Sequence, residues 1–514
     1  MAEGKLWYAV FVGLYLVALL IVGGRKVLKV KSQEDFSLAG RGLTTFVLVG
    51  TLLATWIGTG SIFGYAGETY RRGASAFMLP ITSALGIGLL YLVAARLRRF
   101  GGYTVQDILE ARFGPATRIL GTLTLVGAYV IIVSYQYRAG AAVLGYIFPD
   151  AGGIAMLLVA IFVIAYTALA GMYSVAHTDV ASGIMMTIGV LVAIPFLLSQ
   201  TGGFEAAMES LPPAKQAFNY GPARLLSVLL PPLLLLVGDA NMVQRFFSAK
   251  SAKSARSSAL WMLAGVLVIQ FAIILIALLA SALAAQGVIP HPENDGHIVI
   301  HVAFEALPVW LGAMMIGTVV AIIVSTADSY LLAPSTALVR DVYQRFIRPD
   351  LREDKYVFAS RATVIVTGLI ALWLATMSEK FFDVALFAYT IYGAGITPVL
   401  LAAYFWPRAT PRAALSSMAG GVGVALLWRW LTTIEAQDAL RLSGWPLLAD
   451  FGQWANRLEI DAVIPAFVIS VLLLIVISLA GDPPKEEQAL AFQRLPSEPK
   501  TDAQDWSAVE TSST

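Results

Sequence analysis

The chain contains no cysteine and only four histidines among its 514 residues. The absence of cysteine excludes disulfides, thiolate catalysis and iron–sulfur clusters. Charged residues make up only 13% of the chain and hydrophobic residues 58%, which excludes an ordinary soluble globular domain. The formal net charge of +2 gives no basic surface that would bind nucleic acid.

What the chain has in place of charge is a series of long apolar runs, each of membrane-spanning length. Thirteen runs are expected, so the sequence predicts an all-α polytopic membrane protein embedded in a lipid bilayer. The approximate spans are Leu6–Val22, Thr44–Tyr70, Ala76–Leu97, Ile119–Phe148, Ile154–Ala170, Thr178–Gln200, Pro222–Phe247, Ser258–Gln286, Leu307–Val339, Ala362–Met377, Phe382–Trp406, Ala414–Leu431 and Ile460–Ala480.

Basic residues set the expected orientation of these spans. The first apolar run is followed by Arg25, Lys26, Lys29 and Lys31, which is the reverse of a cleaved signal peptide. Positive residues favour the cytoplasmic side, so we expect the N-terminus outside and, after thirteen spans, the C-terminus in the cytoplasm. Most of the 35 Lys and Arg residues then fall in inside loops. The expected location is a cell membrane, with a bacterial inner membrane favoured.

The chain divides into five expected segments without an inserted soluble domain. Residues 1–43 form an extra first span and its loop, residues 44–200 and 201–406 form two five-helix repeats, and residues 407–480 add two spans. Residues 481–514 are acidic and poor in apolar side chains, which predicts a disordered cytoplasmic tail. No segment predicts an obligate protein partner.

Two of the spans contain helix-breaking residues, and they lie five spans apart. The second span contains Gly58 and Gly60 among several hydroxyl residues, and the seventh contains Pro231 and Pro232 followed by Gly238. This spacing favours an inverted repeat of five plus five helices with two broken helices, and such breaks point to a transporter site near the bilayer midplane. The alternative is that these glycines and prolines have no functional role, because Gly and Pro are frequent in membrane helices.

The ninth span carries the most polar stretch inside the membrane, Ser325-Thr326-Ala327-Asp328-Ser329. Ser325, Asp328 and Ser329 share one helical face through their i, i+3, i+4 spacing. Oxygen ligands without nitrogen or sulfur suit a hard cation. The alternative for Ser325 and Thr326 is that their hydroxyls only form hydrogen bonds to a neighbouring helix. An acidic residue such as Asp328 at this depth in the membrane indicates a functional site.

Several short motifs, in order along the chain, resemble the sodium:solute symporter family, whose members have the leucine-transporter-type inverted repeat. The resemblance covers about Leu6 to Ala480. It rests on Ser37–Arg41 before the broken helix, Ala54 and Ile57 within it, His177-Thr178-Asp179, Val243-Gln244-Arg245 at the end of the seventh span, and Arg408 to Gly423. Several positions depart from the family, among them His177 in place of a usual tryptophan and Ala413 in place of a usual glycine. Ser182 replaces a frequent glutamine, and Leu235 falls where the sugar-transporting branch has a gating tyrosine, which disfavours a neutral sugar.

The resemblance implies a sodium ion as the coupling cofactor and names its ligands. They are the carbonyl oxygens of Ala54, Ile57 and Ile322 and the hydroxyls of Ser325 and Thr326. Five neutral oxygens favour a monovalent ion over calcium, which usually recruits carboxylates. In some family members a second sodium lies between the helices that carry Asp179, Asp328 and Ser329. Here these residues are expected to hold a second sodium or a proton, or to line the exit path, and Asp179 has the alternative of capping a helix.

Arg138 in the fourth span is the candidate for the solute. A guanidinium keeps its charge and needs a partner or a polar cavity at this depth, and its fork suits a carboxylate. We expect Arg138 to hold a substrate carboxylate with the help of Gln136 and Ser61. The alternatives are an ion pair with Glu68 or another acid, or snorkelling toward the surface.

These expectations combine into a sodium-coupled symporter that imports a small organic solute by alternating access. An amino acid, a carboxylate or a vitamin-like acid is favoured over a neutral sugar. A proton-coupled carrier of the same fold is the first alternative, and a channel or an intramembrane enzyme follows. The enzyme is disfavoured because the spans contain no recognisable nucleophile–base set.

Overall fold

The computed structural model describes residues 2–27, 30–377 and 381–492. Twelve helices in this part of the chain are long and apolar enough to cross a membrane, and a bent pair around residues 57–59 makes a thirteenth span. Strands are absent from the described residues, where a single bridge pairs Leu43 with Ala249. The all-helical architecture and the thirteen spans predicted from the sequence are therefore confirmed.

The first half of the bundle begins with α1 and continues through the first broken helix. Its helices are α1 (Ala2–Val27), α2 (Gln33–Leu38), α3 (Thr45–Trp56), η2 (Gly60–Tyr65), α4 (Ala66–Arg72), α5 (Ile81–Phe100), α6 (Val105–Phe113), α7 (Pro115–Ile147) and α8 (Gly152–Thr201). α8 is two spans joined at Gly171, whose φ of 60° and ψ of 177° interrupt the helix. Glycine suits this position because it adopts positive φ without a steric cost.

The second half repeats the broken-helix arrangement and adds two spans. Its main helices are α11 (Pro222–Gly238), α12 (Ala240–Phe247), α13 (Ala252–Ala285), α14 (Ile298–Glu305), α15 (Val309–Ala337), η6 (Leu338–Ile347), α16 (Glu353–Ala375), α17 (Phe381–Phe405), α18 (Pro411–Leu431) and α21 (Val463–Ala480). Shorter helices are α9 (Phe204–Ser210), η5 (Asp295–His297), α19 (Ile434–Leu442), α20 (Pro446–Arg457) and α22 (Glu486–Ala489).

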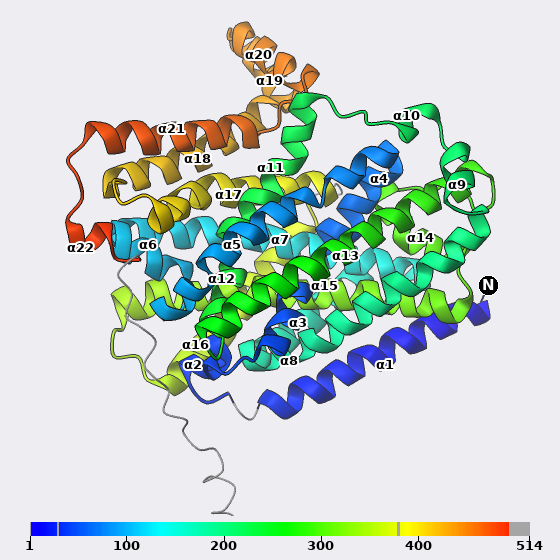
Figure 1. The fold of residues 1–514 in the computed structure, drawn as a ribbon, viewed down its shortest axis with the longest axis horizontal. Coiled ribbons are helices and arrows are strands. Elements are labelled where there is room, and N and C mark those ends of the chain that lie inside the picture. The colour runs from blue at the N-terminus through cyan, green and yellow to red at the C-terminus, as the bar shows by residue number, and fades with distance from the viewer. Residues whose placement is uncertain (1, 28–29, 378–380, 493–514) are drawn as a thin grey trace, which may run out of the picture.

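The long helices lie side by side, and their ends define two faces of the bundle (Figure 1). We call the end with α2, α6 and α22 the α6 face, and the opposite end with α9 and α14 the α14 face. α15 runs through the middle of the bundle, where every residue from Met315 to Ala337 is buried. The broken helix α3–η2 and the sixth span both pack close to it, which brings the proposed ion site into the core.

Two details of the chain differ from the sequence prediction. In the seventh span the helix continues through Pro231 and Pro232 and breaks at Asp239, whose ψ of 118° separates α11 from α12. At the other end of the chain, residues 481–492 do not follow the prediction of a disordered tail. They include α22, and Phe492 is 1% exposed because it packs against Tyr404 and Phe100. Residues 493–514 of the predicted tail lie outside the described residues.

Candidate functional site

The first helix break places backbone polar groups in the protein core. α3 ends at Trp56, Ile57 has a φ of −77° and a ψ of 86°, and the next helical segment begins at Gly60. α15 approaches this break closely, since a Cβ on Gly58 would lie 3.0 Å from the hydroxyl oxygen of Thr326. Any larger residue at position 58 would force Thr326 to shift by a few tenths of an ångström. The two glycines of the second span mark the break correctly.

Ser325 and Thr326 of α15 face this break. The Ser325 hydroxyl lies 3.2 Å from the carbonyl oxygen of Ala54. The Thr326 hydroxyl is buried and has no hydrogen-bond partner among the described residues. A buried hydroxyl without a partner is costly unless a ligand satisfies it, and this oxygen set fits a sodium ion. The five-oxygen sodium site, which also includes Ile57 and Ile322, stays a prediction that this geometry favours.

Asp179 is bonded directly to the proposed sodium site. Its Oδ1 accepts a hydrogen bond of 2.5 Å from Ser325, and its Oδ2 accepts one of 2.5 Å from Thr51. The alternative that Asp179 caps a helix is wrong, because α8 continues without interruption from Gly171 through this position. Asp179 instead joins three spans, α3, α8 and α15, at one buried point.

A guanidinium completes this buried cluster. Arg245 of α12 is fully buried, and its Nη2 lies 2.7 Å from the Ser329 hydroxyl and 3.4 Å from Asp179 Oδ2. Its Nε donates to Thr51 at 2.8 Å. Asp328 joins through Ser329, whose hydroxyl lies 3.3 Å from Asp328 Oδ1. The predicted second-cation residues Asp179, Asp328 and Ser329 are thus brought together, with a basic side chain of the protein among them.

A cavity lies directly beside the first helix break and Thr326. It is lined by Thr55, Trp56, Gly58, Gly60, Ser61, Tyr65, Pro232, Gln270, Thr326, Tyr330, Ala385, Leu386 and Tyr389. Aromatic rings and hydroxyls dominate this lining, and none of its side chains is charged. Ser61 lines the cavity as predicted. Gln136 and Arg138 do not line it, so their role in solute binding stays a prediction.

Two lining residues were missed in the sequence. Gln270 of α13 is 1% exposed, and its side-chain oxygen has no hydrogen-bond partner among the described residues. Tyr389 of α17 reaches the cavity and bonds the hydroxyl of Tyr135 at 2.8 Å. The available signal for Gln270 was a lone amide within an apolar run. Tyr389 had no such signal, because tyrosine is common in these spans.

Asp239 is the second buried acid close to the cavity. It caps α12 by accepting from the backbone N–H groups of Asn241 and Met242. It also accepts from Tyr330 at 2.8 Å and from Tyr129 at 3.1 Å. Since Tyr330 lines the cavity, Asp239 links the cavity wall to the second helix break. These contacts join α7, α12 and α15 through one carboxylate.

Comparison with known proteins adds to this geometry. Residues 36–421 match the sodium:solute symporter family. The chain belongs to the sodium:solute symporter family. It is 27% identical to the sodium/proline symporter of Haemophilus influenzae over 94% of this chain and 96% of that protein. It is 26% identical to the sodium/proline symporter of Escherichia coli over 93% and 94% of the two chains. A solved sodium-coupled sialic acid symporter superposes with a TM-score of 0.78 at 18% identity, covering 93% of this chain and 98% of that chain.

The family membership decides the class of activity. The chain is a multi-span membrane transporter that couples the transport of a small-molecule solute to sodium, and it is not an enzyme. Sodium as the coupling ion is therefore confirmed. The superposition confirms the leucine-transporter-type fold that the family resemblance implied.

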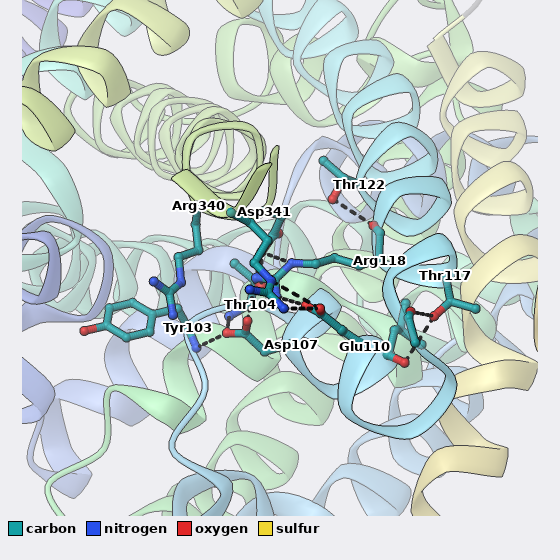
Figure 2. A network of polar contacts seen from close by, with 12 residues as sticks. Tyr103, Thr104, Asp107, Glu110, Thr117, Arg118, Thr122, Arg340 and Asp341 are labelled. Carbon is teal, nitrogen blue, oxygen red and sulfur yellow. Dashed lines mark hydrogen bonds and ion pairs between the residues drawn. The ribbon is translucent and has the colours of Figure 1, made fainter. Parts of the chain in front are cut away.

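The α6 face of the symporter carries an ion-pair network (Figure 2). Arg118 at the start of α7 contacts three acids, Asp107, Glu110 and Asp341. Asp341 lies in η6, the continuation of α15, and also accepts from Thr104 at 2.9 Å. Glu110 receives a second pair from Arg345 at 2.8 Å. Burial alone would raise the pKa of Glu110, but Arg345 and Arg118 outweigh it and hold the pKa below the usual value.

The α14 face of the symporter is covered by η5 and α14. A Cβ on Gly67 of α4 would lie 2.9 Å from the Cα of Gly296, so the two backbones are in contact. Arg71 and Asp295 lie 3.6 Å apart across the same junction. The His297 ring packs edge-on against Phe63 at 5.9 Å, and burial lowers the pKa of His297 to about 4. The described residues hold no cluster of three metal-ligating side chains.

Glu68 of α4 is fully buried near this face. Its partners are Arg71 at 2.9 Å and Arg224 at 3.3 Å, together with Tyr220 at 3.2 Å. All three side chains contact the Glu68 carboxylate directly. An ion pair between Arg138 and Glu68 was one alternative for Arg138, and the structure gives Glu68 other partners.

Proposed function

We propose that the symporter carries a small zwitterionic amino acid, with proline as the leading candidate. The observation that carries the proposal is the uncharged, aromatic-lined cavity that shares Thr326 with the sodium site. A zwitterion brings equal and opposite charges, so it needs dipoles and hydrogen-bonding groups more than a fixed counter-charge. The sodium/proline symporters among the relatives of this chain support proline over other amino acids.

The cavity offers one binding region for each end of such a solute. The helical segment that starts at Gly60 points its N-terminal end at the cavity, and helix N-termini attract carboxylates. Gly58 and Gly60 have no side chains of their own, so the hydroxyls of Thr326 and Tyr389 lie directly against this backbone. The unpartnered oxygen of Gln270 is an acceptor for the solute N–H groups. Trp56, held by a 2.9 Å bond from its Nε1 to Ser83, and Tyr65 provide apolar surface for the ring or side chain.

The coupling follows from the shared position of Thr326. Its hydroxyl serves the sodium ion, and its side chain also lines the solute cavity. Sodium binding fixes α15 against the break at Gly58 and therefore prepares the cavity for the solute. In the proposed orientation the α6 face is cytoplasmic, because Lys31 lies on that side, directly before α2. Inward movement of one sodium ion then supplies ~2.3 kcal/mol per 100 mV for uptake.

The direct test is uptake by purified protein in proteoliposomes. Radiolabelled proline should accumulate when a sodium gradient is imposed, and unlabelled proline should compete more strongly than glucose, a dicarboxylate or sialic acid. Arg138→Lys should leave the KM for proline unchanged, because Arg138 does not line the cavity. Accumulation of a dicarboxylate, together with a raised KM in Arg138→Lys, would instead support a carboxylate anchored by that arginine.

A further inference from the structure

The segment between α18 and α21 folds into a hairpin of two short helices, α19 and α20, at the ends of these spans that lie away from the α6 face (Figure 1). The hairpin projects sideways from the bundle, across the direction of the long helices. Its helices pack on each other and on α18. The solute cavity and the proposed sodium site contain no residue of the hairpin, so its role is separate from theirs.

One face of α20 is apolar and points away from the bundle. It consists of Leu447, Phe451, Trp454 and Leu458, whose spacing of four, three and four residues places them in a single stripe along the helix. Leu447 is 83% exposed, and the other three are between 40% and 49% exposed. A contiguous exposed apolar face of this kind marks an interaction surface.

The face of α20 that packs on the protein is made of small residues. Ala449, Gly452 and Ala455 are buried, and a Cβ on Gly452 would lie 2.2 Å from the carbonyl oxygen of Leu431 at the end of α18. A helix on the surface of a soluble domain normally buries its large apolar side chains instead. The reversed pattern of α20 indicates that the stripe has a partner other than water.

The surface beside the stripe identifies this partner as lipid. The Phe451 ring packs edge-on against Trp428 in the last turn of α18, with ring centroids 5.3 Å apart. In the same turn of α18, Leu427 and Trp430 are about half exposed. Since α18 is a membrane span, these side chains face the bilayer, and the stripe continues their surface onto α20. Tryptophan is enriched at this level of a membrane protein, where lipid meets water.

The third face of α20 is polar. Asp450, Gln453 and Arg457 follow each other at three and four residues, and Asp450 forms an exposed ion pair of 3.0 Å with Arg441 of α19. The three faces of the helix therefore fit three surroundings, which are the protein, lipid and water. This is the pattern of an amphipathic helix that lies in the plane of a membrane surface.

We propose that the α19–α20 hairpin is a lipid-binding element that lies in the headgroup region of the bilayer, with its apolar stripe against the acyl chains. In the proposed orientation this is the outer leaflet. The turn between the two helices extends the apolar surface, because Leu442 is 90% and Trp445 63% exposed.

The base of the hairpin is attached to the bundle, so the stripe has a fixed direction. The carbonyl oxygen of Glu459, just after α20, accepts a hydrogen bond of 3.0 Å from Ser227 of α11. The Glu459 carboxylate lies 3.5 Å from the guanidinium of Arg72 at the end of α4. Since α4 continues the first broken span, the hairpin links the lipid surface to that span.

The test uses spin labels on single cysteines, which is direct because the chain has no cysteine of its own. Leu447→Cys and Leu458→Cys place a label on the stripe, and Gln453→Cys and Arg457→Cys place one on the polar face. Leu472→Cys on α21, 49% exposed, is the lipid-facing control. The full-length protein is reconstituted in vesicles of phosphatidylethanolamine and phosphatidylglycerol. Collisions of each label with oxygen, which concentrates in lipid, and with a water-soluble nickel chelate are then measured.

The ratio of oxygen to nickel collisions should be several-fold higher on the stripe than on the polar face, and it should approach the ratio at Leu472→Cys. Equal nickel access on both faces would place the hairpin in water and overturn the proposal. Low access of both reagents to the stripe would mean that protein covers it, and would overturn the proposal as well. That protein is a second copy of the chain if spin–spin broadening disappears on dilution with unlabelled protein. None of these results depends on the solute or on the sodium site.

Discussion

The Ser325 hydroxyl donates a 2.5 Å hydrogen bond to the carboxylate of Asp179, which lies on a different span. A hydroxyl has one proton, so donation to Asp179 leaves its lone pairs free to face a cation. The carbonyl oxygen of Ala54, 3.2 Å from the same hydroxyl, is then also free to bind the ion. Asp179 thus orients a ligand in the way that outer-shell partners orient ligands in metal sites.

We expect Asp179→Asn to weaken sodium binding by roughly 10- to 100-fold, the usual effect of losing such an outer-shell partner. The solute KM at saturating sodium should change far less, because Asp179 does not line the cavity. Sodium activation curves of uptake measure both quantities. Ser417→Ala is the matched control, since it removes a buried hydroxyl bonded to Ser470 on a distant pair of helices. Equal effects of the two variants would contradict the assignment.

Gln270→Leu should raise the solute KM by roughly 10- to 100-fold, equivalent to the loss of one buried hydrogen bond to a charged group. Leucine retains most of the side-chain volume and removes the unpartnered oxygen. Sodium binding in the absence of solute should be unaffected. The measurement is a comparison of solute KM with sodium Kd in the same preparation. A change in sodium Kd alone would place Gln270 outside the solute site.

Gly60→Ala should weaken solute binding by narrowing the cavity. The added Cβ would lie 2.8 Å from the hydroxyl oxygen of Tyr389, so the tyrosine must move into the space for the solute. Removing that oxygen with Tyr389→Phe should partly restore the KM in the double variant. Gly88→Ala, where the new Cβ meets no atom within 4 Å, is the control. If Tyr389→Phe does not restore the solute KM, solute binding depends on access to the Gly60 backbone and not on the width of the cavity.

Arg118→Gln should destabilise the fold by roughly 3–5 kcal/mol, because it leaves the buried carboxylate of Asp341 without a counter-charge. Arg345→Gln removes a neighbouring arginine from the same network, but its side chain is 55% exposed. Its effect should be below about 1 kcal/mol. Thermal unfolding in detergent compares the two variants. Similar losses would show that the network in Figure 2 acts as a collection of surface pairs.

The packing of η5 and α14 over the α14 face should lose stability in acid. The packed His297 has a pKa of about 4, below the ordinary value of 6.5, because burial disfavours its charged form. An unpacked histidine therefore takes up a proton first, and the stability of the packed state is lost as the pH falls from 6.5 through about 4. His297→Phe should remove this dependence. The unfolding temperatures of both proteins at pH 7 and pH 5 test it, and equal acid shifts would contradict it.

The sequence predicted the spans and the two broken helices because apolar runs and helix breakers are local signals. Ser61, Ser325 and Asp179 were also found locally, as polar residues in apolar surroundings. The partner of Asp179 was not predicted, because the side chain of Arg245 reaches it from a helix 66 residues away. Tyr389 was missed because tyrosine is common in these spans and gives no local signal. Arg138 had an equally strong local signal but lies outside the cavity lining, because the rotation of α7 about its axis is fixed by packing.

The ion pair of Arg245 with Asp179 has an electrical consequence. The two side chains carry one charge of each sign and lie 3.4 Å apart, so this pair adds no net charge that must move when the carrier reorients. The proposed sodium ligands beside the pair are neutral oxygens, so a bound sodium ion adds its full charge to the loaded carrier. An inside-negative potential therefore favours inward movement of the loaded carrier over that of the empty carrier by up to ~2.3 kcal/mol per 100 mV.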